Sequence, residues 1–355
     1  MSERIHPGND HNHRFIVCGR ATEAIYETMK KYARYADTIL LVGETGVGKD
    51  LIAGEIHRLG KRSDKPYIPV PLTALSETLL ESELFGHEKG AFTGADRDKT
   101  GIFEAADGGV LYFPEISELP EQVQIKLLHF IQYRTFRRVG HHPKKPEIRV
   151  DVCLIFATNE DPEECVRRKK IRSDFYYRIN KHQIVIPPLR NRRDEIAMLS
   201  RYFVGHHGQL MFEKEIDISP GALELLRCYD WLGNVRELEH VVQQILIDFS
   251  GEFLNGNSEA RIFDDHVSLT LYPNGSSLKC SLNNGDPDPI NWLFSNNIDL
   301  PAYQKVKTEV KRLYFIRLLE HTDDNLREAA EKAGITERGL RKIMKEIGGN
   351  GGIHR

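Results

Sequence analysis

Short apolar runs alternate with stretches of helical period along the first half of the chain. The apolar runs lie at residues 38–42, 67–72, 110–113, 152–157 and 183–186. Helix-like segments lie before and between them, for example 121–132 and 21–36, in which Ile25, Met29, Tyr32 and Ala33 recur on one face. Strands that alternate with helices predict an α/β domain whose mainly parallel sheet is covered on both faces.

The pattern changes after residue 187. Segments 194–205, 220–228 and 234–249 have helical period with no strand-like run between them, which predicts a small all-helical domain. Residues 251–300 are rich in Asn, Gly, Ser and Pro, which is typical of a linker, and three helical segments follow. The predicted parts are a polar N-terminal tail (1–13), the α/β domain (14–187), the helical domain (188–250), the linker (251–300) and an all-α C-terminal domain (301–355).

Composition narrows the class of protein. No apolar run approaches the roughly 20 residues that a membrane-spanning helix needs, and the polar N-terminus lacks the apolar core of a signal peptide. Five cysteines without a CxxC pair are typical of reduced thiols, so a cytoplasmic location is expected. The net charge is −3, so any nucleic-acid surface must be local. Residues 301–355 offer one, with twelve Lys/Arg against eight Asp/Glu.

A glycine-rich segment with the sequence GETGVGK lies at 43–49, between a predicted strand and a predicted helix. It matches the GxxxxGK pattern of a P-loop, in which backbone N–H groups and the helix N-terminus hold phosphates and Lys49 reaches the β- and γ-phosphates. Asp50 stands where Ser or Thr usually holds magnesium. The predicted nucleotide-binding residues are Gly43, Glu44, Thr45, Gly46, Val47, Gly48, Lys49 and Asp50.

A second P-loop signature is predicted at 110–115, an apolar strand that ends in an acid. Glu115 is expected to orient and deprotonate the attacking water. The preceding position should be an Asp that holds the magnesium shell, but it is Pro114, which has no side-chain oxygen. The predicted magnesium residues are therefore Asp50 and Glu115.

The segment ELFGHEKGAFTGA at 83–95 contains the sequence GAFTGA. It resembles the hallmark loop of sigma-54-dependent enhancer-binding proteins, which are AAA+ ATPases. Gly90 and Gly94 permit a tight reversal that lifts Phe92 and Thr93 off the body of the domain. The resemblance implies ATP and Mg²⁺ as cofactors, a hexameric ring, and contact with sigma-54 RNA polymerase through Gly90, Ala91, Phe92, Thr93, Gly94 and Ala95.

Further motifs of this family follow in order. Residues 151–159 resemble the sensor I strand, which implies roles for Thr158 and Asn159 at the phosphates. Residues 171–178 resemble the segment that bears the arginine fingers, which implies that Arg172 and Arg178 act on a neighbouring subunit's nucleotide. Residues 231–238 resemble sensor II, which places Arg236 at the nucleotide and makes the helical domain the AAA+ lid.

A departure from the family lies at residue 71. The family has an Asn there that restrains the catalytic Glu, whereas this chain has Pro71, which cannot make that side-chain hydrogen bond. Together with the proline before Glu115, this favours slow or unregulated hydrolysis of ATP.

The C-terminal segment 324–347 resembles the Fis-type helix-turn-helix of this family. Gly334 makes the turn and Thr336 caps the third helix. Duplex DNA, the upstream activating sequence of a promoter, is the expected partner, contacted by Thr336, Arg338, Arg341, Lys342 and Lys345. A helical dimerisation bundle with a solvated basic face is the alternative.

Three functions account for the sequence to different degrees. The leading hypothesis is an ATP-dependent activator of sigma-54 RNA polymerase. The second is an ATP-binding DNA regulator that hydrolyses ATP poorly and acts as a scaffold or mixed-ring partner. A small-molecule P-loop kinase is the third, and it explains neither the GAFTGA segment nor the basic tail.

Overall fold

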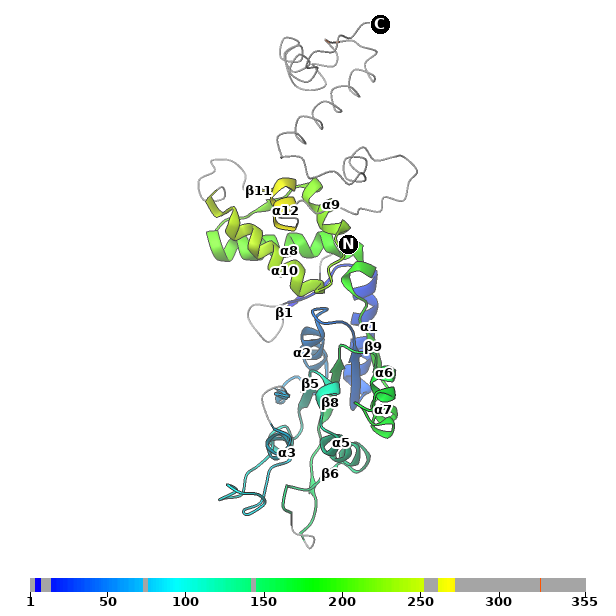
Figure 1. Cartoon of the computed structure of the whole chain (residues 1–355). Coiled ribbons are helices and arrows are strands. Elements are labelled where there is room, and N and C mark those ends of the chain that lie inside the picture. Colours follow the sequence, from blue (N-terminus) through cyan, green and yellow to red (C-terminus); the bar gives the residue numbers. More distant parts are fainter. Residues whose placement is uncertain are drawn as a thin grey trace. The chain divides into compact units, whose positions relative to one another are not determined.

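A computed structural model describes residues 4–7, 14–72, 76–141, 145–251, 261–271 and 326. Its first part is a three-layer α/β domain (Figure 1) built on a five-stranded sheet of order β4-β5-β8-β3-β9. All neighbouring strands of this sheet are parallel. Their bounds are β3 Thr38–Val42, β4 Tyr67–Pro69, β5 Val110–Phe113, β8 Cys153–Thr158 and β9 Gln183–Val185.

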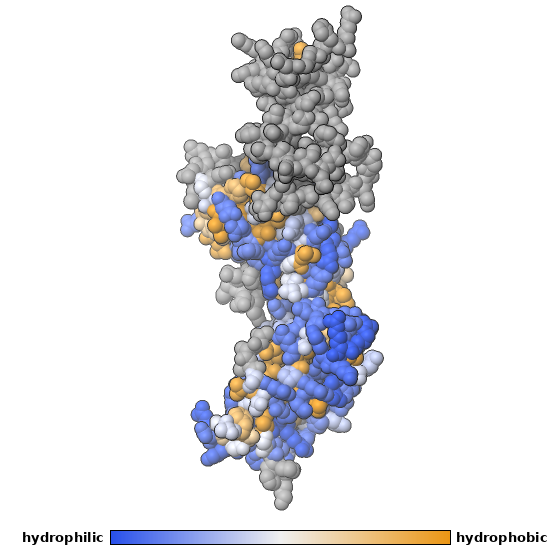
Figure 2. Space-filling view, in the orientation of Figure 1, coloured by the Kyte–Doolittle hydropathy of each residue, from blue (hydrophilic) through white to orange (hydrophobic). Residues whose placement is uncertain are grey.

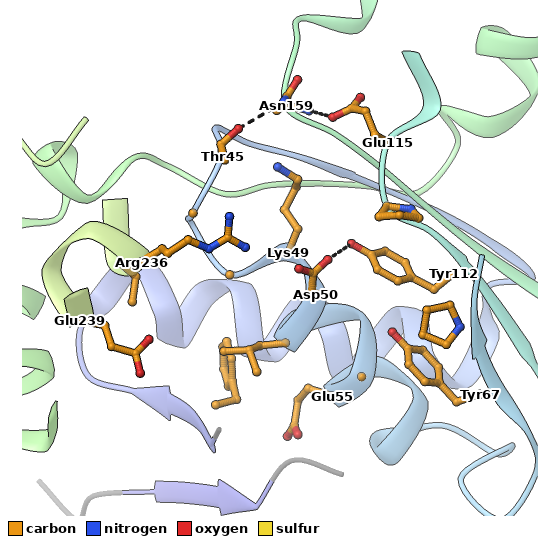
Figure 3. Close-up of a pocket in the computed structure, with 18 residues that line it drawn as sticks. Thr45, Lys49, Asp50, Glu55, Tyr67, Tyr112, Glu115, Asn159, Arg236 and Glu239 are labelled. Atoms are coloured by element: carbon orange, nitrogen blue, oxygen red, sulfur yellow. Dashed lines mark hydrogen bonds between the residues drawn. The ribbon is translucent and has the colours of Figure 1, made fainter. Parts of the chain in front are cut away.

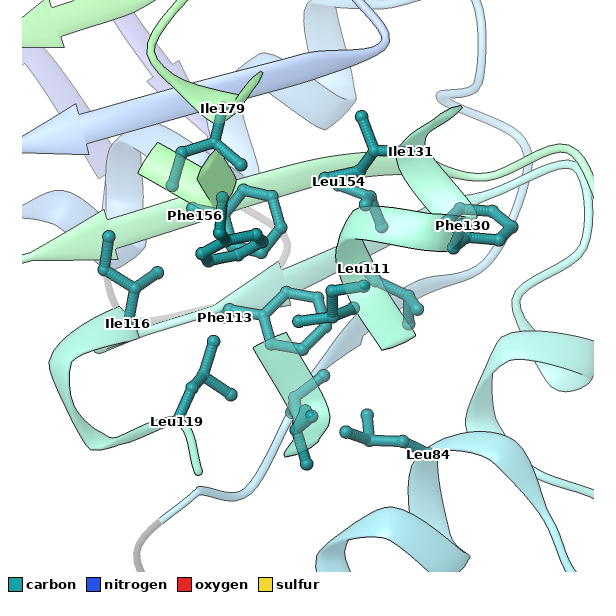
Figure 4. Packing of buried hydrophobic residues seen from close by; sticks show 14 of the residues in the cluster. Leu84, Leu111, Phe113, Ile116, Leu119, Phe130, Ile131, Leu154, Phe156 and Ile179 are labelled. Carbon is teal, nitrogen blue, oxygen red and sulfur yellow. The ribbon is translucent and has the colours of Figure 1, made fainter. Parts of the chain in front are cut away.

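Alternating side chains of the strands fill two separate cores. On one face Leu111, Phe113 and Phe156 pack with α3 (Glu77–Phe85), α5 (Glu121–Tyr133) and α7 (Ser173–Ile179), as Figure 4 shows in part. On the other face Ile39 and Tyr112 pack with α1 (Arg20–Tyr35) and α2 (Lys49–Leu59). Because successive strand residues point to opposite faces, each β5 residue belongs to one core only. The fold class expected from the sequence is confirmed.

The N-terminal segment contains a strand that the sequence did not predict. Strand β1 (Arg4–Pro7) lies in the expected polar tail and pairs antiparallel with β2 (Arg14–Val17). Short elements complete the α/β domain. They are α4 (Ile102–Ala105), η1 (Ile116–Glu118), the pair β6 (Thr135–Phe136) and β7 (Ile148–Arg149), and α6 (Pro162–Arg167).

A helical subdomain follows, with its own core around Trp231, which is fully buried and donates from Nε1 to the Leu226 carbonyl at 2.7 Å. Two short turns, η2 (Leu189–Asn191) and η3 (Arg193–Glu195), lead into its helices. These are α8 (Ile196–Phe212), α9 (Pro220–Cys228), α10 (Asn234–Asp248) and α12 (Asp264–Leu271), with the parallel pair β10 (Asp217–Ile218) and β11 (Arg261–Ile262).

The helical subdomain extends beyond residue 250, where the linker was expected to begin. Ile262 and Val267, from β11 and α12, are fully buried in its core. The rest of the predicted linker from residue 272 and the predicted DNA-binding residues (Thr336, Arg338, Arg341, Lys342 and Lys345) lie outside the described residues.

Two further expectations concern the cysteines and the surface. Cys18, Cys153 and Cys165 are free thiols. No helix in the described part of the chain is long and apolar enough to cross a membrane. In Figure 2 the visible α/β surface is mainly hydrophilic, and apolar side chains gather on the helical subdomain near α12.

Candidate functional site

The segment between β3 and α2 forms a loop with the backbone of a phosphate-binding turn. Gly46 and Gly48 adopt left-handed φ values of +80° and +100°, which other residues rarely adopt, and Gly48 is the N-cap of α2. The Lys49 ammonium donates to the carbonyl of Gly43 at 2.7 Å and to that of Glu44 at 3.2 Å. Burial lowers the pKa of Lys49, and the negative charge of nearby Glu115 partly offsets this decrease. The lysine side chain therefore folds back over the loop. Its ammonium group can exchange these two carbonyl oxygens for the phosphate oxygens of a ligand.

The start of α10 docks directly on this loop. The Gly46 carbonyl accepts from the backbone N–H groups of Val235 at 3.0 Å and Arg236 at 3.3 Å. The Glu44 carboxylate pairs with the Arg190 guanidinium and accepts from Asn234 Nδ2 at 3.1 Å. The Arg190 hydrogen bonds are the main cause that lowers the pKa of Glu44 to about 2. The glycine-rich loop and the helical subdomain are thus linked by backbone hydrogen bonds and by an ion pair.

A cavity of about 630 Å³ lies between the loop and the helical subdomain (Figure 3). Its lining brings together eight of the residues predicted from the sequence, namely Thr45, Gly46, Gly48, Lys49, Asp50, Glu115, Asn159 and Arg236. Lysine and arginine nitrogens and carboxylate oxygens therefore share one hollow of the size that small-molecule ligands occupy. A second, apolar hollow adjoins it, shares Phe15, Leu51 and Val235 with the first, and is further lined by Tyr202 and Phe203.

Glu115 is held by hydrogen bonds at the end of β5. Its Oε2 accepts from the backbone N–H of Asn159 at 2.9 Å, and its Oε1 accepts from Ser117 Oγ at 2.9 Å. Asn159 Nδ2 in turn donates to Thr45 Oγ1 at 3.2 Å, which joins the end of β8 to the loop. A carboxylate fixed in this way beside Lys49 is suited to orient a water molecule against a bound phosphate.

Thr158 does not line the cavity. It is fully buried at the end of β8, and its hydroxyl bonds with the backbone of Glu160. These hydrogen bonds hold the turn that carries Asn159.

Oxygen donors for a magnesium ion are few at the cavity. Pro114 lines it without a donor, while Asp50 lines it with a carboxylate whose Oδ1 accepts from the Tyr112 hydroxyl at 2.6 Å. No cluster of three or more His, Cys, Asp or Glu side chains suited to a metal occurs among the described residues. One or two carboxylates nevertheless fit Mg²⁺, because this ion usually keeps several waters and takes its other ligands from substrate phosphates.

Several contacts at the site were not predicted from the sequence. They involve Tyr112, Ser117, Arg190 and Asn234. Only Tyr112 carried a signal, since it stands two positions before Pro114 in a strand and must share its face.

The two predicted arginine fingers differ in their surroundings. Arg172, at the N-cap of α7, pairs with Asp174 at 3.0 Å and with Glu121 at 2.7 Å. Arg178, six residues further along in α7, is half-buried and makes no side-chain hydrogen bond or ion pair with the described part of the chain. Neither residue lines the cavity.

The GAFTGA segment forms a tight reversal. Gly90 and Gly94 have positive φ values, and the Gly90 N–H donates to the Ala95 carbonyl at 2.8 Å. Thr93 is exposed, but Phe92 is half-buried and packs edge-on against His87, with ring centroids 5.0 Å apart. Phe92 therefore contacts a histidine of its own segment, and Thr93 is the more exposed of the two side chains at the reversal.

A neighbouring hairpin braces this reversal. The Glu88 N–H donates to the Val139 carbonyl at 2.9 Å, and the Glu88 carboxylate pairs with Lys145 at 2.9 Å and with His141. Gly140 passes so close to Ala91 that a Cβ there would lie 2.6 Å from the alanine methyl group. In Figure 1 the segment after α3 and the connection from β6 extend from the same end of the α/β domain.

A parallel sheet of this order, a glycine-rich phosphate loop and a helical subdomain docked on the loop define an AAA+ nucleotide-binding module. Comparison with known families agrees. Residues 15–185 match the sigma-54 interaction domain, and residues 190–257 match the AAA+ ATPase lid domain. The chain belongs to the AAA+ family of sigma-54-dependent regulators.

Individual relatives support this membership. The chain is 36% identical over 321 residues to the regulatory protein AtoC of Escherichia coli K12, covering 90% of this chain and 64% of the relative. It is 45% identical over 240 residues to a Nif-specific regulatory protein of Herbaspirillum seropedicae, covering 67% of this chain and 44% of the relative. The chain thus spans less than two thirds of the length of these relatives.

Solved structures share the fold. The crystal structure of NtrX from Brucella abortus in complex with ADP matches with a TM-score of 0.64 and 24% identity, covering 94% of this chain and 70% of that one. The structure of the same protein in complex with ATP matches with a TM-score of 0.63 and 23% identity, covering 94% and 69%.

Proposed function

We propose that this protein is an ATP-dependent activator of sigma-54 RNA polymerase that works in the cytoplasm. The observation that carries the proposal is the combination, in one sigma-54 interaction domain, of the cavity around Lys49, Glu115 and Arg236 with the GAFTGA reversal. The first is suited to a nucleoside triphosphate, and the second offers an exposed Thr93 and a half-exposed Phe92 to a protein partner.

Each cavity residue has a role in this proposal. The ammonium of Lys49 neutralises the β- and γ-phosphates, Glu115 orients and deprotonates the attacking water, and Arg236 transmits the state of the nucleotide to the lid. Asp50 and Glu115 would hold Mg²⁺ together with the phosphates, and this ion would neutralise charge that develops on the transferred phosphoryl group. Asn159 keeps Glu115 in place through its backbone N–H.

The proposal includes a ring of several copies, by family resemblance a hexamer. Arg172 and Arg178 lie outside their own cavity, so each would complete the cavity of a neighbour. The C-terminal segment would bind duplex DNA and hold such rings near a promoter.

A second candidate is a regulator that binds ATP but hydrolyses it poorly. Pro114 favours it, because a strand-end carboxylate for the metal is missing. Pro71 also favours it, since it has no side-chain amide to restrain Glu115. Glu115 itself is present and held in place, which favours the first candidate.

The rate of ATP hydrolysis, measured against protein concentration, separates the two candidates. The first predicts a turnover that rises steeply as rings form and that Glu115→Gln abolishes. A wild-type rate no higher than that of Glu115→Gln at every concentration would leave only the second candidate.

Phe92→Ala tests the role of the GAFTGA reversal. We expect it to bind ATP with wild-type affinity and to fail in opening a sigma-54 promoter, with Leu79→Ala, at an exposed position of α3, as the control. Loss of ATP binding by Phe92→Ala would contradict the separation of loop and cavity.

A further inference from the structure

Pro114 lines the cavity without a side-chain oxygen that could bind a metal ion. Residues alternate along β5, so Tyr112 and Pro114 both line the cavity while Phe113 is fully buried in the opposite core. The end of the strand therefore faces the nucleotide cavity with a side chain that cannot bind a metal ion or its water.

A carboxylate reaches the cavity from a different element. Asp50 is in the first turn of α2, next to Lys49, and its side chain is exposed to the cavity. Figure 3 shows that it points across the cavity toward β5, where its Oδ1 accepts from the Tyr112 hydroxyl at 2.6 Å. The other carboxylate oxygen makes no hydrogen bond with the described residues and remains available as a ligand.

The tyrosine is itself held rigidly. Tyr112 is only 2% exposed and stacks on Tyr67, with ring centroids 6.3 Å apart and planes at 15°. A buried donor with a fixed ring selects one orientation of an otherwise mobile carboxylate.

We propose that Tyr112 is a positioning residue that makes Asp50 the metal-shell carboxylate in place of the one that Pro114 lacks. In this chain the acid stands at the start of α2 and not at the end of β5, and a tyrosine two residues before the proline orients it. This inference rests on the proposed nucleotide binding. Partners that orient a metal ligand typically change metal affinity about 10–100-fold when they are removed.

The test uses the full chain with ADP and Mn²⁺, and electron paramagnetic resonance reports free and bound Mn²⁺. With protein in excess over ADP, Tyr112→Phe should weaken Mn²⁺ binding about tenfold and change the bound spectrum, without changing the affinity for ADP in EDTA. Asp50→Asn should cause the same loss, and adding Tyr112→Phe to it should cause no further loss. Pro114→Asp in the Tyr112→Phe background should restore the affinity for Mn²⁺.

Tyr67→Phe is the matched control, because it keeps the stacked ring and removes a hydroxyl that makes no hydrogen bond with the described residues. It should bind Mn²⁺ as the wild type does. An unchanged Mn²⁺ affinity in Tyr112→Phe would overturn the inference, and so would an equal loss of ADP affinity in EDTA, which would assign the hydrogen bond a purely structural role. A wild-type protein that binds no ADP would overturn the proposed function as well.

Discussion

Replacing Gly46 with alanine is expected to separate the lid from the phosphate loop. Gly46 has a φ of +80°, and a Cβ built on it would lie 2.1 Å from the Gly233 carbonyl oxygen and 3.3 Å from Arg236 Cβ. Real Cβ atoms do not approach a backbone oxygen so closely, so either the loop or the start of α10 must move. Movement of either breaks the hydrogen bonds that the Gly46 carbonyl accepts from Val235 and Arg236.

The loss of stability expected in Gly46→Ala has two contributions. A left-handed residue with a side chain costs about 1–2 kcal/mol. Two backbone hydrogen bonds contribute a net of about 0.5–1.5 kcal/mol each. Gly46→Ala should therefore lower the free energy of unfolding by about 2–5 kcal/mol, measured by urea denaturation with the fluorescence of tryptophan, including the buried Trp231, as the signal. Its affinity for ATP, measured with a fluorescent analogue, should fall at least about tenfold.

Gly48→Ala is the control for backbone strain, because Gly48 has a φ of +100° and a Cβ there would meet nothing within 4 Å. This substitution should lower the free energy of unfolding by the strain contribution alone, about 1–2 kcal/mol. Equal destabilisation by the two substitutions would refute the argument that the loop and lid are held together through Gly46.

Three further predictions concern other parts of the molecule. Gly140→Ala should displace the GAFTGA reversal through its clash with Ala91 and abolish promoter opening at wild-type ATP affinity, whereas Gly108→Ala, at a positive-φ glycine outside the reversal whose Cβ would meet only the Lys65 side chain at 3.9 Å, should retain more activity. Arg178→Ala should leave the unfolding midpoint unchanged and reduce concentration-dependent ATP hydrolysis about a thousandfold, and an unreduced rate would exclude it as a finger. Because Arg190 lowers the pKa of Glu44 from 4.5 to about 2, the pair should stabilise the protein fully above pH 4.5 and lose this effect as the pH falls toward 2. Denaturation of Arg190→Met across that range should lack this pH dependence, and a dependence equal to that of the wild type would contradict the assignment.

The elements and the glycine-rich loop could be predicted because they depend on local patterns. Buried strands of a parallel sheet appear as short apolar runs, and the loop must follow the first of them. The end of the lid was missed for a physical reason. Helix α12 follows a stretch rich in Asn and Gly, and only a few apolar residues, among them Ile262 and Val267, anchor it and β11 in the lid core.

The contacts that complete the site depend on the fold and not on spacing. Tyr112 and Asp50 are 62 positions apart, while Glu44 lies 146 positions from Arg190 and 190 from Asn234. Sequence motifs predicted that Lys49 belongs to a nucleotide site, but only the arrangement of β5 beside α2 brings a tyrosine to the neighbouring aspartate. The packing of Phe92 on His87 was likewise not predictable, because glycine positions permit a reversal without fixing what its tip touches.

The most direct test of the central claim is the formation of open promoter complexes by sigma-54 RNA polymerase. Purified full-length protein is mixed with the holoenzyme and a sigma-54 promoter whose start site carries a fluorescent base analogue. We predict that fluorescence rises only with the protein and hydrolysable ATP, and that Glu115→Gln or Phe92→Ala gives no rise. A rise of the same size without ATP, or no rise with the wild-type protein at concentrations where it hydrolyses ATP, would contradict the account.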